Sequence, residues 1–306
     1  DAERYPAEVA EGLYHAALAE IRSLRPDKAG ALYERAVELK PNFGPALHAL
    51  AELAMERGDS RRAADLLTRQ ASATTDPVER LRMFEALGDM AMLTLGDEAR
   101  ARVCYEAAVT AASPLEAEHV PLLTKLLELQ DLASDHLGTA RTAELLASYA
   151  AKDTERSARL TVAAENYEAA GDRKRATDAA ERAIAAAPQD LTAVNIASQL
   201  AMDDGAYDKA ITVLARALGG RGKSDDLSAP REALLWNRLG QARLNRRDRK
   251  GAITAFEQAV AIASDSDGAM EARRSLLDLW KGADETKSRL VQYHRTLATD
   301  SRRLGD

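Results

Sequence analysis

The chain is poor in cysteine and in aromatic residues. Among its 306 residues Cys104 is the only cysteine, which excludes an intrachain disulfide and a zinc site built from cysteines. Cys104 is flanked by apolar positions, so we expect it to be a small core residue rather than a reactive thiol. Aromatic residues make up 4% of the chain and hydrophobic residues 46%. Alanine and leucine must therefore fill most of the core, which favours closely packed helices over sheets.

Long apolar runs and an excess of positive charge are also missing. No stretch approaches the roughly 18 consecutive apolar residues of a membrane span, and we expect no direct membrane insertion. The net charge of -7 argues against a nucleic-acid partner, which would need a basic stripe. The net negative charge lies in residues 1–150, which carry 25 acidic and 16 basic side chains, whereas residues 151–306 carry 24 and 26. The chain begins at Asp1 without a signal pattern. We expect a cytoplasmic location, with a processed or excised periplasmic segment as the alternative, and the oligomeric state stays open.

Residues that could carry catalysis or hold a cofactor are scattered. The five histidines lie in distant segments without the spacing that a metal site requires. Residues 217–224 (ALGGRGKS) satisfy a relaxed phosphate-loop pattern, but they follow the end of a predicted helix instead of a strand. Asp225 and Asp226 come directly after them. No Gly-x-Ser-x-Gly turn offers a nucleophile. We therefore expect no metal, no cofactor and no enzymatic activity.

Residues 236–263 form the clearest copy of a repeating unit. Trp236 and Gly240 fall at i and i+4 and so share one face of a helix. After a short charged turn, Ala252 and Phe256 mark the buried face of a second helix. Small residues stand where the two helices must approach closely, and large side chains fill the spaces beside them. The unit is therefore a helical hairpin.

This pattern, Trp-x2-Leu-Gly followed by Ala-x3-Phe, resembles the tetratricopeptide repeat, with Arg243 where that family usually has Tyr. Ala29 and Ala63 are 34 residues apart, as are Ala176 and Ala210, and this spacing is the period of the family. All nine prolines fall at boundaries or in first turns under this division. The resemblance implies an all-α, right-handed superhelical solenoid of about seven to eight antiparallel helical hairpins.

The predicted hairpins divide the whole chain, residues 1–306, as one solenoid domain. The third hairpin carries one extra residue in its turn, and the fourth is degenerate because the small residues of the motif do not align there. We expect the end of the chain to form a final pair of capping helices, at 268–281 and 284–303. The predicted hairpins cover residues 6–40, 44–75, 77–113, 115–151, 154–188, 190–219 and 229–264, and the cap covers 268–306.

The resemblance also implies where a partner would bind. In such solenoids the first helix of each hairpin lines the concave surface, and side chains beside its apolar stripe face the groove. The first three-quarters of the chain offers carboxylates there, which favour Lys or Arg on a partner. The last quarter offers amides, which can hold the backbone of an extended peptide. The candidate partner-binding residues are His48, Glu52, Glu85, Asp89, Glu165, Asn195, Gln199, Asn237, Gln241 and Asn245.

We therefore expect a protein–protein interaction scaffold that binds an extended peptide or a partner protein, with basic residues, in its concave groove. One alternative is a regulatory or sensor arm of a larger multidomain protein. Another is an architectural, self-associating subunit without a peptide ligand. For any single groove residue, the competing interpretation is that its polar side chain only solvates the surface.

Overall fold

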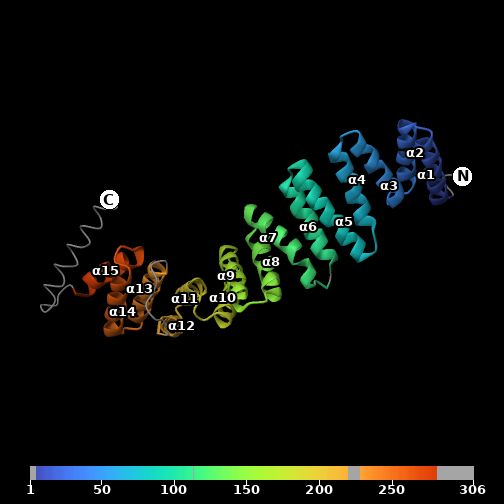
Figure 1. Cartoon of the computed structure of the whole chain (residues 1–306). Helices are drawn as coiled ribbons and strands as arrows, with labels where there is room; N and C mark the ends of the chain where they lie inside the picture. Colours follow the sequence, from blue (N-terminus) through green and yellow to red (C-terminus); the bar gives the residue numbers. More distant parts are fainter. Residues whose placement is uncertain (1–4, 113, 220–227, 281–306) are drawn as a thin grey trace. The chain divides into compact units, whose positions relative to one another are not determined.

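The computed structural model describes residues 5–112, 114–219 and 228–280, and every structural statement below concerns these residues. They contain helices and no strand, so the all-α prediction is confirmed. The chain divides into two compact units, residues 1–138 and 139–306, and we describe each by itself. In both units antiparallel helices follow one another along the chain (Figure 1). The division into one continuous domain and the hand of the superhelix stay predictions. The predicted helix at 284–303 lies outside the described residues.

Unit 1 holds three helical hairpins and the first helix of a fourth. We call the first helix of each hairpin helix A and the second helix B. Helix A of the third hairpin ends in a π-helical turn, η1, and a short 3-10 turn, η2, precedes the last helix. The elements are α1 (Pro6–Arg22), α2 (Pro26–Leu39), α3 (Gly44–Glu56), α4 (Ser60–Ala73), α5 (Pro77–Met90), η1 (Ala91–Leu95), α6 (Glu98–Ala111), η2 (Ala117–His119) and α7 (Val120–Leu132).

Unit 2 begins within the first turn of a helix and continues with three hairpins and one further helix. Its elements are α8 (His136–Tyr149), α9 (Asp153–Ala169), α10 (Arg173–Ala186), α11 (Leu191–Asp203), α12 (Tyr207–Gly219), α13 (Ala229–Asn245), α14 (Arg249–Ile262) and α15 (Asp267–Trp280). Helices α9, α11 and α13 are helices A, and α15 follows in the position of the next one. Successive members of this series contact one another directly.

The turn between helices A and B repeats one backbone geometry. In four hairpins a glycine takes a left-handed conformation there, with φ of 76° at Gly58 and 71° at Gly205, for example. In three of these hairpins, those of Gly58, Gly96 and Gly171, the next residue is an aspartate that caps helix B. Asp59 Oδ1, for example, accepts a hydrogen bond from the Arg62 backbone N–H at 3.0 Å. Three other turns place a residue with a side chain at the left-handed position: Leu24, Ser134 and Arg247.

The third hairpin accommodates its extra residue inside a helix. Helix α5 passes into the π-helical turn Ala91–Leu95 before Gly96 adopts φ of 61° and ends it. A π-helical turn is the structure that one inserted residue produces in an α-helix, because the backbone hydrogen bonds skip one residue further. The insertion therefore widens helix A rather than lengthening the loop, and it turns Leu93 outward, where 88% of the side chain is exposed.

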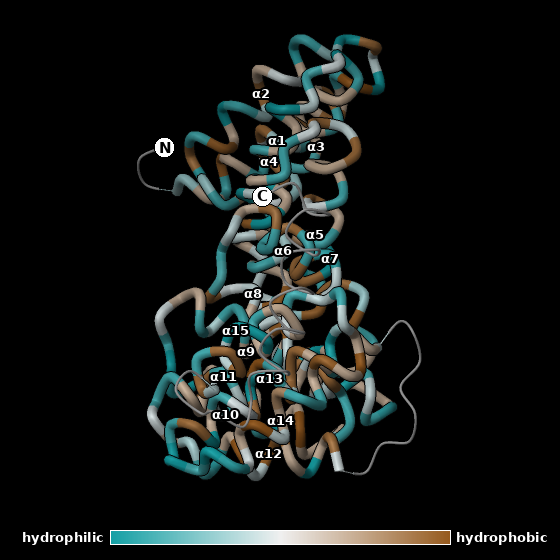
Figure 2. The backbone as a smooth tube through the Cα atoms, turned by 90° about the vertical axis from the view of Figure 1, so that its left-hand side faces the viewer, coloured by the Kyte–Doolittle hydropathy of each residue, from teal (hydrophilic) through white to brown (hydrophobic). Residues whose placement is uncertain are grey.

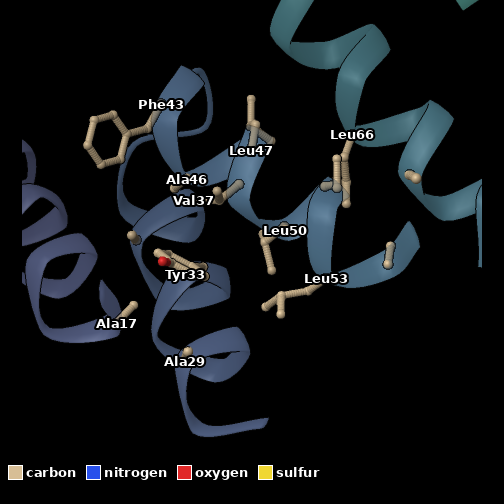
Figure 3. Close-up of a cluster of buried hydrophobic side chains, with 14 of the residues drawn as sticks. Ala17, Ala29, Tyr33, Val37, Phe43, Ala46, Leu47, Leu50, Leu53 and Leu66 are labelled. Atoms are coloured by element: carbon tan, nitrogen blue, oxygen red, sulfur yellow. The ribbon is translucent and has the colours of Figure 1, made fainter. Parts of the chain in front are cut away.

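The core is built mainly from alanines and leucines. At two places where helices approach closely at a glycine, an aromatic ring of the second helix packs against that glycine. In α13, Gly240 lies directly beside the fully buried ring of Phe256 from α14, and in α5 Gly88 lies beside Tyr105 from α6 in the same way. Teal and brown segments alternate along the helices, as expected for elements with one buried side (Figure 2). Figure 3 shows the cluster around Tyr33, which gathers side chains from α1, α2 and α3.

Candidate functional site

Unit 1 contains an open pocket of ≈ 550 Å³ bordered by α1, α2 and α3. Two of the predicted groove residues, His48 and Glu52, line it from helix α3. Its size lies within the range of about 300–1,000 Å³ that is usual for small-ligand sites. The residues that line it are Tyr14, Leu18, Ile21, Leu24, Pro26, Tyr33, Pro45, His48, Ala49, Glu52, Leu53 and Glu56.

Aromatic rings form the base of this pocket. The ring of Tyr14 lies 5.6 Å from that of Tyr33 and 5.5 Å from that of Phe43, measured between centroids, and the Tyr14 and Phe43 rings make a T-shaped contact. Tyr33 is buried. Burial, followed by the nearby Tyr14 phenol and the negative charge of Glu52, raises the pKa of Tyr33. The carboxylate of Glu52 thus lies close enough to the Tyr33 ring for its negative charge to affect the Tyr33 phenol.

Carboxylates and one exposed leucine form the rim. His48 Nε2 lies 3.4 Å from Glu52 Oε1, one helical turn along α3, and both side chains are more than half exposed. Glu56 follows on the same helix one turn later and is also exposed. Leu24, in the turn before α2, also lines the pocket and is held in a left-handed conformation with 89% of its side chain exposed. The pocket therefore combines an apolar interior with a negatively charged rim.

A second polar group on helices A of unit 1 surrounds Lys125. The ammonium nitrogen of Lys125, on α7, lies 2.8 Å from Asp89 Oδ1 and 3.5 Å from Glu85 Oε1, both on α5. The Tyr105 hydroxyl donates a hydrogen bond to the same Asp89 oxygen at 2.7 Å. The structure therefore brings the predicted residues Glu85 and Asp89 together and adds a lysine that the sequence reasoning missed.

The pKa values in this Lys125 group reflect the ion pair. Partial burial alone would raise the pKa of Asp89, but the hydrogen bonds from Lys125 and Tyr105 outweigh it, and the pKa is lowered. Burial opposes the charge of Lys125, yet its bond to Asp89 raises the pKa of the ammonium. Burial, and then the bond to Asp89, raises the pKa of the Tyr105 phenol. Asp89 is thus held ionised and Lys125 protonated at neutral pH.

In unit 2 two of the predicted amides, Asn237 and Gln241, are hydrogen-bonded within the chain. Asn237 is only 4% exposed, and its amide nitrogen donates a hydrogen bond to Glu271 Oε2 at 2.8 Å. The expectation that this amide faces an open groove is wrong, because α15 packs against α13 and covers it. Gln241 is half-buried and donates to Ser275 Oγ at 2.9 Å. Both contacts join residues 34 apart, so they link equivalent positions of successive helices.

The remaining predicted residues of unit 2 differ in their surroundings. Asn195 accepts hydrogen bonds from Arg238 Nη1 through its backbone oxygen at 2.6 Å and its side-chain oxygen at 2.5 Å. Gln199 donates to Asp203 Oδ1 at 2.8 Å on its own helix. Glu165 and Asn245 are exposed. Although Glu165 is exposed, desolvation of its carboxylate by nearby protein atoms, and then the charge of Glu168, raises its pKa. Contact of these residues with a partner stays a prediction.

Several residues that shape these sites escaped the sequence reasoning. Lys125 and Arg238 each reach across from the next helix A, and Glu56 completes the pocket rim. A cross-comparison of equivalent positions one period apart could have found the contacts to Glu271 and Ser275, since 34 residues separate the partners. Lys125 gives no such signal because the extra residue in α5 and the degenerate hairpin shift the period.

Other features of the described residues bear on function. The thiol of Cys104 is buried, which confirms it as a core residue, and burial raises its pKa. No three His, Cys, Asp or Glu side chains in the described part come together as metal ligands would. None of the helices described here combines the length and the apolar character that crossing a membrane demands. Residues 220–227, which include most of the phosphate-loop-like stretch, lie outside the described part.

Three models of the tetratricopeptide repeat match the sequence, over residues 46–81, 161–226 and 233–266. No curated protein sequence matches the chain. Solved structures that resemble the chain include the following three. The MamA protein shares 16% identity with a TM-score of 0.48, covering 61% of this chain and 94% of its own. A C-terminal part of a TPR repeat-containing protein from Cytophaga hutchinsonii shares 12% at 0.46, covering 85% and 98%. YrrB, described as a TPR protein with an unusual peptide-binding site, shares 14% at 0.46, covering 69% and 99%.

The fold and the pocket define a helical-repeat protein that presents an interaction surface. The matched repeats occupy both units, and the match over residues 233–266 covers the hairpin in which Gly240 lies beside Phe256. The chain is therefore a tetratricopeptide-repeat protein and, as a class, a protein-interaction scaffold. Repeats of this family are typically interaction modules without catalytic activity. The three structural similarities have TM-scores below 0.5, so the assignment rests on the family models and on the hairpins of the chain itself.

Proposed function

We propose that unit 1 binds an extended peptide segment of a partner protein, and that the segment places an apolar side chain in the pocket between α1, α2 and α3. A Lys or Arg next to that side chain would meet the carboxylates of Glu52 and Glu56. The observation that carries this proposal is the pocket itself, with rings at its base and carboxylates at its rim.

The two parts of the pocket would contribute differently to binding. Full burial of one Leu or Phe side chain contributes about 1.5–3 kcal/mol, and the pocket is large enough to receive one. An exposed ion pair contributes about 0.2–1 kcal/mol, which is small. The apolar contact would therefore supply most of the affinity, whereas the carboxylates would select against acidic peptides and favour basic ones.

Unit 1 is favoured over unit 2 by the state of its polar side chains. Glu52 and Glu56 are exposed at the rim of an open pocket, whereas Asn195, Asn237 and Gln241 are hydrogen-bonded to neighbouring helices. A peptide that used these amides would first have to break the contacts between repeats. Glu165 and Asn245, which are exposed, stay candidates for secondary contacts with a longer partner.

A selection of displayed random peptides on the full chain tests this function. We expect enrichment of sequences with an aromatic or aliphatic residue beside Lys or Arg. A selected peptide, labelled for fluorescence anisotropy, should then bind Glu52→Gln/Glu56→Gln at least about threefold more weakly than the wild type, in line with the loss of two exposed ion pairs. Leu18→Arg, which places a charge inside the pocket, should abolish binding.

Glu98→Gln is the matched control, because Glu98 is an exposed glutamate at the start of helix α6, outside the pocket. It should bind like the wild type. Absence of any enriched motif, enrichment of acidic peptides, or equal binding by the pocket variants would contradict the proposal. If in addition the mass of the chain in sedimentation equilibrium rises with concentration, the architectural, self-associating alternative would replace it.

A further inference from the structure

Lys125 lies against the carboxylates of Glu85 and Asp89, where a cation of a ligand could otherwise bind. Glu85 and Asp89 of α5 follow the same motif residues as His48 and Glu52 follow in α3, since Phe84 and Gly88 of one hairpin correspond to Leu47 and Ala51 of the other. The two carboxylates therefore stand on the pocket-lining side of the next helix A in unit 1. Met90, also on α5, packs against the core cluster of α1 to α4, which places α5 next to that pair of hairpins.

The group that Glu85 and Asp89 hold is an alkylammonium. Lys125 Nζ contacts both carboxylates, at 3.5 Å and 2.8 Å, and its ammonium also lies 5.5 Å from the centre of the Tyr105 ring. The structure thus shows this site holding a cation of the kind that a basic peptide would bring. The Lys125 side chain is 39% exposed, so it could leave for solvent without a buried charge being left behind.

We propose that Lys125 acts as a built-in competitor that limits the binding groove of unit 1 to ligands with one basic residue. This inference rests on the proposed function of the pocket. A second basic residue on a peptide would have to displace Lys125 from Glu85 and Asp89. Because this exchange replaces one cation by another, it adds little binding free energy. The wild type should therefore bind the basic residue that contacts Glu52 and gain no affinity from a second one.

The spacing between the two subsites follows from helix packing. Helices that pack directly lie about 8–10 Å apart, and α3 and α5 both pack on α4, so we take this distance as the smallest separation between Glu52 and the Glu85–Asp89 pair. An extended peptide advances about 3.3 Å per residue. A second basic residue should therefore reach Glu85 and Asp89 from about three positions away. If Lys125 competes in this way, removal of its charge should let the second basic residue of a peptide contribute to the affinity, which it does not do in the wild type.

Three synthetic peptides test the inference on the full chain by fluorescence anisotropy. The mono-basic probe is Ser-Gly-Phe-Arg-Gly-Ser-Gly-Ser. Two bis-basic probes carry a second Arg three positions after or before the first. We expect the wild type to bind mono-basic and bis-basic probes within about twofold of each other. Lys125→Gln should bind one bis-basic probe about five- to tenfold more tightly than the mono-basic probe, as expected for two restored ion pairs.

Control variants separate this effect from general charge and from folding. Lys28→Gln removes the same charge at an exposed position on helix B of the first hairpin, and it should leave the ratio between the probes unchanged. Lys125→Met keeps an apolar side chain of similar length beside Tyr105 and should behave like Lys125→Gln, which covers the case that Gln disturbs packing. Lys125→Gln/Asp89→Asn should lose the gain.

The binding of the three probes to the wild type and to the Lys125 variants distinguishes the role of Lys125 from that of the pocket. A wild type that already prefers bis-basic probes about tenfold, or a Lys125→Gln variant that shows no preference while it still binds the mono-basic probe, would overturn the role of Lys125. If neither protein binds any probe, this role and the proposed reading of Phe-Arg in the pocket are both wrong. If only the Lys125 variants bind, and only bis-basic probes, the Lys125 inference stands and the pocket proposal fails.

Discussion

Replacement of Gly88 by alanine should destabilise unit 1, although the same change elsewhere in a helix stabilises it. Ala is favoured over Gly in a helix interior by about 0.5–1 kcal/mol. At Gly88, however, a Cβ atom would lie 2.5 Å from Tyr105 Cδ1. The Tyr105 ring is 3% exposed, and its hydroxyl is bonded to Asp89 at 2.7 Å, so the ring cannot move without losing that bond. Overpacking of this kind costs about 1–3 kcal/mol. The net loss should be about 0.5–2 kcal/mol.

Gly12→Ala in the same unit is the matched control. Gly12 lies within α1, is exposed, and has nothing within 4 Å of the position that a Cβ would take. This variant should gain about 0.5–1 kcal/mol from helix propensity alone. Urea unfolding of the full chain, followed by far-UV circular dichroism, should shift to lower urea for Gly88→Ala and to higher urea for Gly12→Ala. If Gly88→Ala unfolds at or above the wild-type midpoint, the close approach of α5 and α6 described here is incorrect.

Two further predictions concern the turns and the Lys125 group. Arg247 has φ of 62°, a conformation that costs residues with a side chain about 1–2 kcal/mol, so Arg247→Gly should stabilise unit 2 by about 0.5–1 kcal/mol. A rise in the thermal midpoint checks this, Gly205→Ala should lower it, and a fall for Arg247→Gly would contradict the reasoning. The folded-state pKa of Asp89 is lowered, so its stabilisation is present above the unfolded pKa of about 3.9 and is lost as the pH falls through the folded value. Between pH 6 and pH 3 the urea midpoint should therefore drop less for Asp89→Asn than for the wild type, and equal drops would argue against the pair.

The hairpin repeat could be predicted from the sequence because its signals are local. Helix periodicity, prolines in first turns, and the Gly-Asp pair that ends one helix and caps the next all act within a few residues of one another. Cys104 could be placed in the core by the same pattern. Even the degenerate fourth hairpin keeps this logic, since α7 begins with Pro121 in its first turn and Ser134 takes the left-handed turn position.

The candidate site was predicted only in outline. The sequence correctly placed His48 and Glu52 on helix A, and they do line the pocket, but it could not show that Tyr14 and Tyr33 meet beneath them. It also treated Asn237 as a groove residue, whereas α15 buries it. The pattern of polar and apolar side chains along one helix indicates which face of that helix is polar. It does not state whether a neighbouring helix covers that face.

The sequence alone determined that the chain is all-α, where its hairpins turn, and that the net negative charge lies in its first half, which has fewer basic side chains than the second. These properties follow from backbone preferences and residue spacing, which act over one or two helical turns. Only the tertiary structure decided which polar side chains remain available. Lys125 neutralises Asp89 across 36 residues, and Glu271 binds Asn237 across 34. Such contacts depend on how closely successive helices pack, and that distance is set by the summed packing of side chains from several hairpins rather than by any single segment.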